Sequence, residues 1–254
     1  MSSLRIHRNS PGPGVAELGM VEAPEAGHGC RVCLVRHLAV CTALPADQAS
    51  ALEQLTGDTR LHAGELLARE GDLRRYVFTV QTGALRRTRT LADGRRLVAG
   101  FLMPGDYIGF SSATHYRHTI EAITDSTLCA VSHEGMRTLC ATYHGLEHEL
   151  MQRACIELDA TRDKLMALAR MTPPERLAGF LLDMVQRRQR QGLDDAVVAL
   201  PMTRTDIADY LGLTIETVSR CFTKLRGEGL IATPDPHTVQ LLDRKKLELL
   251  AAAA

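Results

Sequence analysis

The 254-residue chain contains no tryptophan, and only 4% of its residues are aromatic, so aliphatic side chains must build its cores. No run approaches the roughly 18 apolar residues of a membrane-spanning helix, and the N-terminus lacks the basic and apolar regions of a secretory signal. The chain has no net charge, because 30 Lys and Arg residues balance 30 Asp and Glu residues. We therefore expect a cytoplasmic protein with no membrane partner, whose overall charge neither favours nor excludes nucleic acid.

Cysteine is well represented, with seven residues, and an odd number in a cytosolic chain makes a poor disulfide framework. Cys30, Cys33 and Cys41 form a C-x2-C-x7-C pattern, and Cys129 lies far downstream on an expected strand. A C-x2-C pair lets two thiolates converge on one centre. Because a second tight pair is missing, the pattern favours a [4Fe–4S] cluster over zinc. Free thiols or a disulfide pair are the alternatives that the pattern leaves open.

Residues 1–27 are polar and rich in Pro and Gly, and we interpret them as a mobile extension. Beyond residue 61, short β-prone runs alternate with turn signals and predict a small β-roll or barrel. Asp93 and Gly94 predict a type I′ hairpin turn between two of these runs. A helix is expected within residues 45–55, and strands are expected at 76–81, 84–91, 95–101, 119–122 and 127–131.

The period changes between residues 145 and 170, where seam residues recur with a strict alternating spacing of three and four. An a/d seam of about three heptads normally faces another helix. Packing of this helix against its own β-roll is the alternative, but so narrow a stripe favours a parallel dimer. The seam consists of Met151, Ala154, Leu158, Thr161, Leu165 and Leu168.

A helix-turn-helix pattern occupies residues 202–230, after an amphipathic helix that begins near Pro173. Thr203 is the expected N-cap of its first helix, Gly212 ends that helix, and Thr214 is the expected N-cap of the second. The stretch 230–242 can then fold as a small β wing. This arrangement is typical of proteins that place the second helix in the major groove of DNA.

The exposed face of the second helix carries side chains suited to DNA. Arg220 can bind guanine through two hydrogen bonds, and Glu216 can accept from cytosine N4. An ordinary ion pair between these two residues is the alternative interpretation. Ser and Thr hydroxyls suit phosphate contacts. The candidate DNA-binding residues are Thr203, Thr214, Glu216, Thr217, Ser219, Arg220, Thr223 and Lys224.

Together these motifs resemble the CRP/FNR superfamily of bacterial transcription regulators, and most closely its oxygen-sensing FNR branch. The matching pieces, within residues 28–245, are CRVCLVRHLAVC, GELLAREGD, TGALRRTR, PGDYIGF, Cys129, PPERLAGFLLD and LTIETVSR. The resemblance implies an α+β fold in three parts. A cysteine loop and β-roll sensor domain, similar to a cyclic-nucleotide-binding domain, would span 28–144. A dimerisation helix would span 145–170, and a winged helix-turn-helix domain 171–254.

The resemblance further implies that Cys30, Cys33, Cys41 and Cys129 ligate an oxygen-labile [4Fe–4S] cluster. The intact cluster would favour a homodimer, and oxygen would convert the cluster and release that dimer. Glu216, Ser219 and Arg220 would read TTGAT-like half-sites, arranged as an inverted repeat in double-stranded DNA. RNA polymerase is the other implied partner, at genes of anaerobic or low-oxygen metabolism.

Two other functions were weighed against this one. A regulator of the same architecture could sense a cyclic nucleotide or haem in the β-roll, but Ser111, Ser112 and Arg117 lack the Arg–Ser arrangement that a cyclic phosphate needs. A thiol oxidoreductase using Cys30 and Cys33 is the weakest reading, because no βαβ pattern follows the C-x2-C pair and no phosphate loop is present. We therefore expect a regulator that is not an enzyme.

Overall fold

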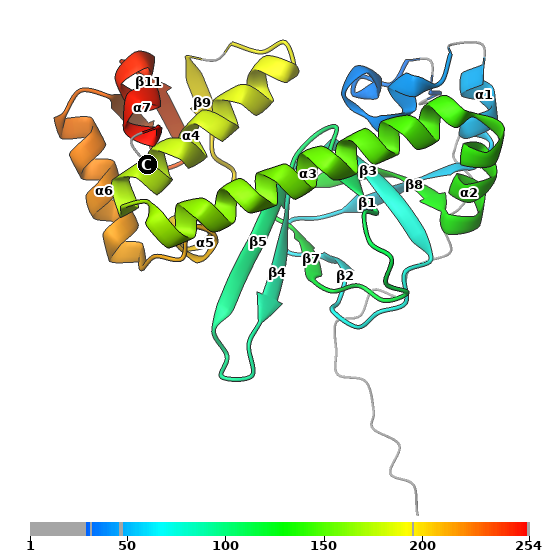
Figure 1. The fold of residues 1–254 in the computed structure, drawn as a ribbon, viewed down its shortest axis with the longest axis horizontal. Helices are drawn as coiled ribbons and strands as arrows, with labels where there is room; N and C mark the ends of the chain where they lie inside the picture. Colours follow the sequence, from blue (N-terminus) through cyan, green and yellow to red (C-terminus); the bar gives the residue numbers. More distant parts are fainter. Residues whose placement is uncertain (1–28, 31, 46–47, 195, 253–254) are drawn as a thin grey trace, which may run out of the picture.

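The structure is a computed structural model that describes residues 29–30, 32–45, 48–194 and 196–252. It confirms the expected α+β architecture, with a β-roll, a long helix and a C-terminal helical domain that carries a wing (Figure 1). The extension predicted at residues 1–27 lies outside the described residues. Within the described ranges, no helix is both long and apolar enough to cross a membrane.

The β-roll consists of two four-stranded sheets with the orders β1-β8-β3-β6 and β2-β7-β4-β5. Buried side chains from both sheets, among them Phe78, Leu85 and Leu128, pack together between them. Gly83 joins β3 to β4 with a φ of +81°, and a Cβ at this position would overlap Ser126. The strands are β1 (Thr56–Leu61), β2 (Leu66–Ala68), β3 (Tyr76–Thr82), β4 (Leu85–Thr90), β5 (Arg96–Leu102), β6 (Tyr107–Ile108), β7 (Thr119–Ala122) and β8 (Ser126–Ser132).

Two local predictions for this domain need correction. The helix expected within residues 45–55 is only the short α1 (Ala49–Glu53). The type I′ turn is wrong, because Gly94 has a positive φ but Asp93 does not. The Gly94 N–H donates to the Leu91 carbonyl at 2.9 Å, so the chain reverses one residue earlier. A single left-handed glycine at the end of such a turn is sufficient to match the twist of the two strands.

Helix α3 (His144–Arg170) runs along the molecule and connects its two ends (Figure 1). The cysteine segment, with the 3-10 turns η1 (Arg36–Leu38) and η2 (Val40–Ala43), lies beside the N-terminal part of α3. Helix α2 (His133–Thr142) precedes α3, and Leu139 and Leu146 bury a small core together with Val40. This core ties the cysteine segment to the start of the long helix.

The C-terminal domain begins with α4 (Pro173–Arg190), whose N-terminus is closed by a capping box between Thr172 and Glu175. Its core includes Leu181, Phe222 and Leu247. The wing is a three-stranded sheet in the order β10-β11-β9. The remaining elements are β9 (Val197–Ala199), α5 (Arg204–Leu211), α6 (Ile215–Gly227), β10 (Ile231–Asp235), β11 (Thr238–Leu241) and α7 (Arg244–Ala251).

The β-roll and the C-terminal domain also contact each other directly. Val98 and Phe101 of β5 belong to the same buried apolar cluster as the core of the C-terminal domain. The ring centroid of Phe101 lies 5.2 Å from that of Tyr210 on α5 and 6.1 Å from that of Phe180 on α4. The two domains are therefore joined by this contact as well as by α3.

Candidate cysteine centre and nucleic-acid interface

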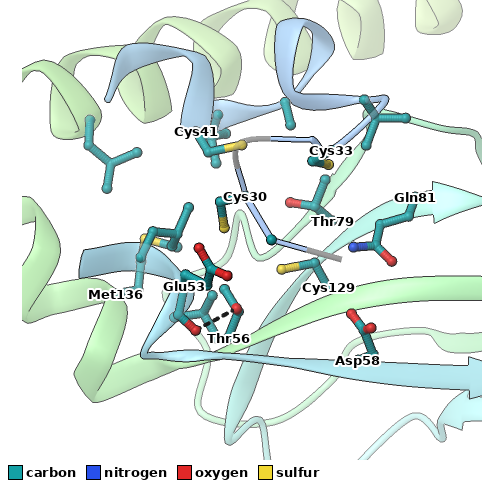
Figure 2. A pocket seen from close by; sticks show the side chains of 17 residues that line it. Cys30, Cys33, Cys41, Glu53, Thr56, Asp58, Thr79, Gln81, Cys129 and Met136 are labelled. Atoms are coloured by element: carbon teal, nitrogen blue, oxygen red, sulfur yellow. Dashed lines mark hydrogen bonds between the residues drawn. The ribbon is translucent and has the colours of Figure 1, made fainter. Parts of the chain in front are cut away.

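The four cysteines singled out by the sequence line one cavity of about 260 Å³ (Figure 2). Cys30 and Cys33 precede η1, Cys41 lies in η2, and Cys129 lies on β8 beneath this loop. All four thiols are half-buried and none is in a disulfide. The fold thus brings together two segments that are far apart in the sequence, as the prediction requires.

The floor of the cavity is the outer face of the sheet that contains β8. Leu128 and Ala130 point into the core of the roll, so Cys129 between them faces the other way. In the strand register Cys129 pairs with Asp58 of β1 on one side and with Thr79 of β3 on the other. The polar face of the sheet therefore presents a thiol, a carboxylate and a hydroxyl to the cysteine loop.

Two arginines hold the loop that forms the roof. Arg36 donates hydrogen bonds to the carbonyls of Cys30 at 3.3 Å and of Leu44 at 2.5 Å. Arg153 of α3 donates to the Leu38 carbonyl at 2.6 Å and forms an ion pair with Glu149. Because Arg153 belongs to the long helix, the position of the cysteine loop is linked directly to that helix.

Three of the thiols that line this cavity, those of Cys30, Cys41 and Cys129, have raised pKa values. Burial, reinforced by the neighbouring Cys41, raises the pKa of Cys30 to about 11. Burial also raises the pKa of Cys41 and of Cys129, and in Cys129 the neighbouring Cys30 adds to this effect. A metal centre would have to displace these protons and supply the positive charge that the cavity lacks.

Four cysteine thiols are the donor set that a four-iron cluster would use. In the part of the chain that the structure describes, no three His, Cys, Asp or Glu side chains converge closely enough to bind one metal ion. A [4Fe–4S] cluster instead takes one cysteine thiolate at each of four irons, so its ligands surround a volume. Four thiols around a 260 Å³ cavity match that requirement.

The other cysteines lie elsewhere. Cys140 is half-buried on α2, Cys155 is exposed on α3, and Cys221 is buried on α6. A small apolar side chain could occupy the position of Cys221 equally well. These three residues therefore serve as internal comparisons for the four that line the cavity.

The helix-turn-helix forms as its caps predict. Thr203 and Asp206 close a reciprocal capping box at the start of α5, and Gly212 ends that helix with a φ of +65°. The Thr214 hydroxyl accepts from the Thr217 N–H at the start of α6. The hydroxyls of Thr203 and Thr214 thus have structural roles, whatever further contact they make with DNA.

Helix α6 buries Val218, Phe222 and Leu225 and leaves its other face open to solvent. Arg220 donates to the Thr217 hydroxyl at 3.2 Å, and no ion pair joins it to Glu216 among the described residues, so both remain available to a ligand. The hydrogen bond of Glu216 to its own backbone N–H, followed by that from Thr214, lowers the pKa of this exposed carboxyl. The remaining candidates on this face, Ser219, Thr223 and Lys224, are exposed as well. Their contact with DNA stays a prediction.

The predicted seam of α3 is left uncovered in the single chain. Met151, Leu158, Leu165 and Leu168 are 63%, 50%, 67% and 37% exposed. Thr161 is exposed too, and Ala154 is half-buried. Apolar side chains in a row on a solvent-facing helix are the pattern expected of a partner helix rather than of packing on the same β-roll.

Sequence analysis missed several polar residues around both sites. Glu53 and Asp58 line the cysteine cavity, but no local pattern marks them. The Arg204 guanidinium lies 3.4 Å above the Phe222 ring, next to the recognition helix. A basic residue at the first position of α5 is a signal that could have marked Arg204 as a candidate phosphate contact.

Comparison with known proteins agrees with this description. A model of the Crp-like helix-turn-helix domain matches residues 175–250, and one of the cyclic nucleotide-binding domain matches residues 58–143. The nitrogen fixation regulation protein FixK of Bradyrhizobium diazoefficiens is 37% identical over 89% of this chain and 95% of its own length. The transcriptional activator protein FnrL of Cereibacter sphaeroides is 32% identical over 89% of this chain and 93% of its own length.

The solved structure of FixK2 from Bradyrhizobium japonicum has a TM-score of 0.73 and 34% identity, and covers 78% of this chain and 98% of that one. The relatives are regulators of transcription and not enzymes. The β-roll, the exposed recognition helix and these similarities lead to one conclusion: the chain belongs to the CRP/FNR family of DNA-binding transcription regulators.

Proposed function

We propose that this regulator binds DNA as a homodimer whose formation is controlled by an oxygen-labile [4Fe–4S] cluster. Cys30, Cys33, Cys41 and Cys129 would hold the cluster. The observation that carries the proposal is the assembly of these four thiols, and of none of the other three cysteines, around a single cavity. When bound, the cluster supplies an oxygen-sensitive cross-link between the loop and strand β8.

The protein's own residues provide the route from this cavity to DNA. Cys41 lies in the turn that packs on α3, and Arg153 links α3 to the same loop through the Leu38 carbonyl. A loop tethered to β8 would hold this contact, and a released loop would loosen it. Since dimer association through an exposed seam is a balanced equilibrium, a small change at one end of α3 can shift it.

In the dimer, the two α6 helices would read half-sites about one helical turn apart. We propose TTGAT-like half-sites in inverted repeat, read by Glu216, Ser219 and Arg220, with RNA polymerase as the further partner at the promoter. The exposure of all three side chains on one face of α6 supports this assignment. The genes controlled would be those of anaerobic or low-oxygen metabolism.

The test is the iron and acid-labile sulfide content of protein purified without oxygen, together with its absorbance spectrum. We expect about four irons and four sulfides per chain in the wild type. Cys129→Ala should lose both, whereas Cys140→Ala, a half-buried cysteine outside the cavity, should retain them. An iron-free wild type that still binds DNA would refute the cluster.

A second candidate, a regulator that senses a cyclic nucleotide or haem in the β-roll, is favoured by the match of residues 58–143 to cyclic nucleotide-binding domains. The loop after β6 argues against it, because Arg74 donates to the carbonyls of Gly109, Ser111 and Ala113 and braces the loop internally. Arg117 is exposed. A Soret band, or binding of a cyclic nucleotide measured by calorimetry, would favour this candidate instead.

A further inference from the structure

A network of ion pairs crosses the boundary between the sensor domain and the DNA-binding domain. Arg86 of β4 donates to both carboxylate oxygens of Asp206 at 2.9 and 3.0 Å, and Arg96 of β5 donates to the same carboxylate at 2.9 Å. Arg96 also pairs with Asp209 at 2.8 Å, and Arg86 pairs with Glu121 of β7 at 2.7 Å. We call these five residues the interdomain clamp.

Asp206 is the centre of the clamp. Its side chain is 0% exposed, and it is already used in the capping box with Thr203 at the start of α5. Burial acts to raise the pKa of Asp206, but the hydrogen bonds from Thr203 and the charges of Arg86 and Arg96 outweigh it and lower the pKa. The carboxylate of Asp206 is thus bound both by Thr203 of its own domain and by two arginines of the β-roll. Only this arrangement of the two domains brings both arginines within reach of it.

The clamp does something that the apolar contact beside it cannot do. The contact of Phe101 with Phe180 and Tyr210 is largely non-directional, so a small rotation of the domain would cost little. A carboxylate gripped by two guanidinium groups tolerates no such rotation, because each hydrogen bond has a fixed length and angle. Buried ion pairs often specify one arrangement more than they add stability.

We infer that Arg86, Arg96 and Asp206 are positioning residues that fix the orientation of the helix-turn-helix on the β-roll, and so preset the spacing of the two recognition helices. This inference rests on the proposed dimeric binding to an inverted repeat. Without the clamp, each DNA-binding domain samples several orientations. The apparent affinity for paired half-sites is then reduced in proportion to the fraction of time that both domains are correctly placed.

The test uses the full chain, with variants that spare local structure. Asp206→Asn keeps an oxygen for the capping box and removes the charge. The double variant Arg86→Met with Arg96→Met removes the two guanidinium groups that the β-roll contributes to the clamp. Arg95→Met is the matched control, because Arg95 is the neighbour of Arg96 in the same hairpin but pairs with Asp93 at the surface. Circular dichroism confirms that each variant is folded.

The first measurement needs no DNA. Small-angle scattering coupled to gel filtration should show a larger radius of gyration for both clamp variants than for the wild type and Arg95→Met, at equal oligomeric state. An unchanged radius in both clamp variants would overturn the inference whether or not the cluster and the half-sites are correctly proposed.

The second measurement compares two duplexes, one with an inverted repeat of two half-sites and one with a single half-site, using protein prepared without oxygen. We expect the clamp variants to bind the paired duplex about tenfold more weakly and the single half-site duplex unchanged. Equal loss on both duplexes would indicate damage to the reading helix, and unchanged or tighter binding to the pair would also overturn the inference. A wild type that does not prefer the paired duplex would refute the proposed binding of a dimer to two half-sites. The scattering result would still test the clamp in that case.

Discussion

The cysteine cavity and the recognition helix lie toward opposite ends of α3 and are built in opposite ways (Figure 1). The cavity draws its walls from the cysteine loop, the 3-10 turn η2, the helices α1, α2 and α3, and three strands. The recognition face comes from one 13-residue helix with its own cap at Thr214. The first is assembled only by the tertiary fold, whereas the second is complete as soon as α6 forms.

This difference teaches where control can be exerted. A half-buried set of thiols, three of them with raised pKa values, is a site whose charge and geometry would change if a metal centre were gained or lost. A capped helix packed through Val218 and Phe222 is held by contacts within its own domain. In the proposed function, sensing would therefore act on where the reading helices are placed, and the seam of α3 and the clamp are the elements that would transmit it.

The largest expected effect comes from disrupting the predicted seam of α3, which lies between the cysteine cavity and the recognition helix. Leu158→Arg would place two like charges across the predicted seam, and we expect at least a hundredfold weaker dimer, or about 3 kcal/mol, by sedimentation equilibrium. Met166→Arg, at an even more exposed apolar position of α3 outside the seam (64% against 50% for Leu158), is the control and should leave dimerisation unchanged. Iron content should be normal in both. A fully dimeric Leu158→Arg protein would show that the seam lies elsewhere.

The next effect separates the recognition of DNA by α6 from the proposed sensing at the cysteine cavity. Arg220→Ala should lower affinity for the inverted repeat tenfold or more, since one bidentate contact to a base is worth about 1–3 kcal/mol of discrimination. The loss should be confined to sequences that keep the cognate guanine. Lys224→Ala, if it contacts phosphate, should weaken binding to all sequences and reduce the salt dependence. Titration by fluorescence anisotropy at several salt concentrations measures both, and loss of iron in either variant would contradict the separation.

The two regions also differ in how far sequence could predict them. The caps of α5 and α6 and most of their buried apolar positions follow from local periodicity, whereas the burial of Asp206 and Cys221 was not predicted. Of the cavity, only the cysteines were found. Strand β1, which carries Asp58, has the sequence TGDTRL and no alternating pattern, so neither the strand nor its pairing with β8 was expected. The C-x2-C pair marked the ligands but not their surroundings.

The clamp shows the same limit more sharply. Asp206 was recognised only as the capping partner of Thr203, which is a contact across three residues. Its two arginines lie 120 and 110 residues away, in a hairpin whose many basic residues look like an ordinary solvated face. Nothing local separates Arg96, which crosses to the other domain, from Arg95, which does not. Only the packing of β5 on α5 makes the distinction.

The C-terminal third of α3 can be probed through Lys164, which lies between the two regions. Its ammonium lies 3.6 Å above the Tyr210 ring, and burial, assisted by Arg87, lowers its pKa from 10.5 to about 8. Between these values the folded state binds fewer protons than the unfolded state, so stability rises with pH. Relative to Lys164→Met, the wild type should gain about 1–2 kcal/mol of unfolding free energy across this window. Urea unfolding at several pH values measures this free energy, with the exposed Lys245→Met as the control. A difference between wild type and Lys164→Met that does not change with pH would contradict the prediction.

The smallest expected effect lies within the cavity. Asp58 is paired with Cys129 in the strand register, so its carboxylate would stand beside a thiolate ligand of the proposed cluster. Removing this charge should stabilise the oxidisable centre by about 0.5–1 kcal/mol, the energy of two charges a few ångströms apart at a wet site. Asp58→Asn should therefore load normally without oxygen and lose its absorbance in air about two- to fivefold more slowly. Glu134→Gln makes the same charge change at an exposed site of the same domain and should decay like the wild type. Faster decay of Asp58→Asn would mean that the carboxylate holds the loop in place, and that geometry rather than charge limits access of oxygen.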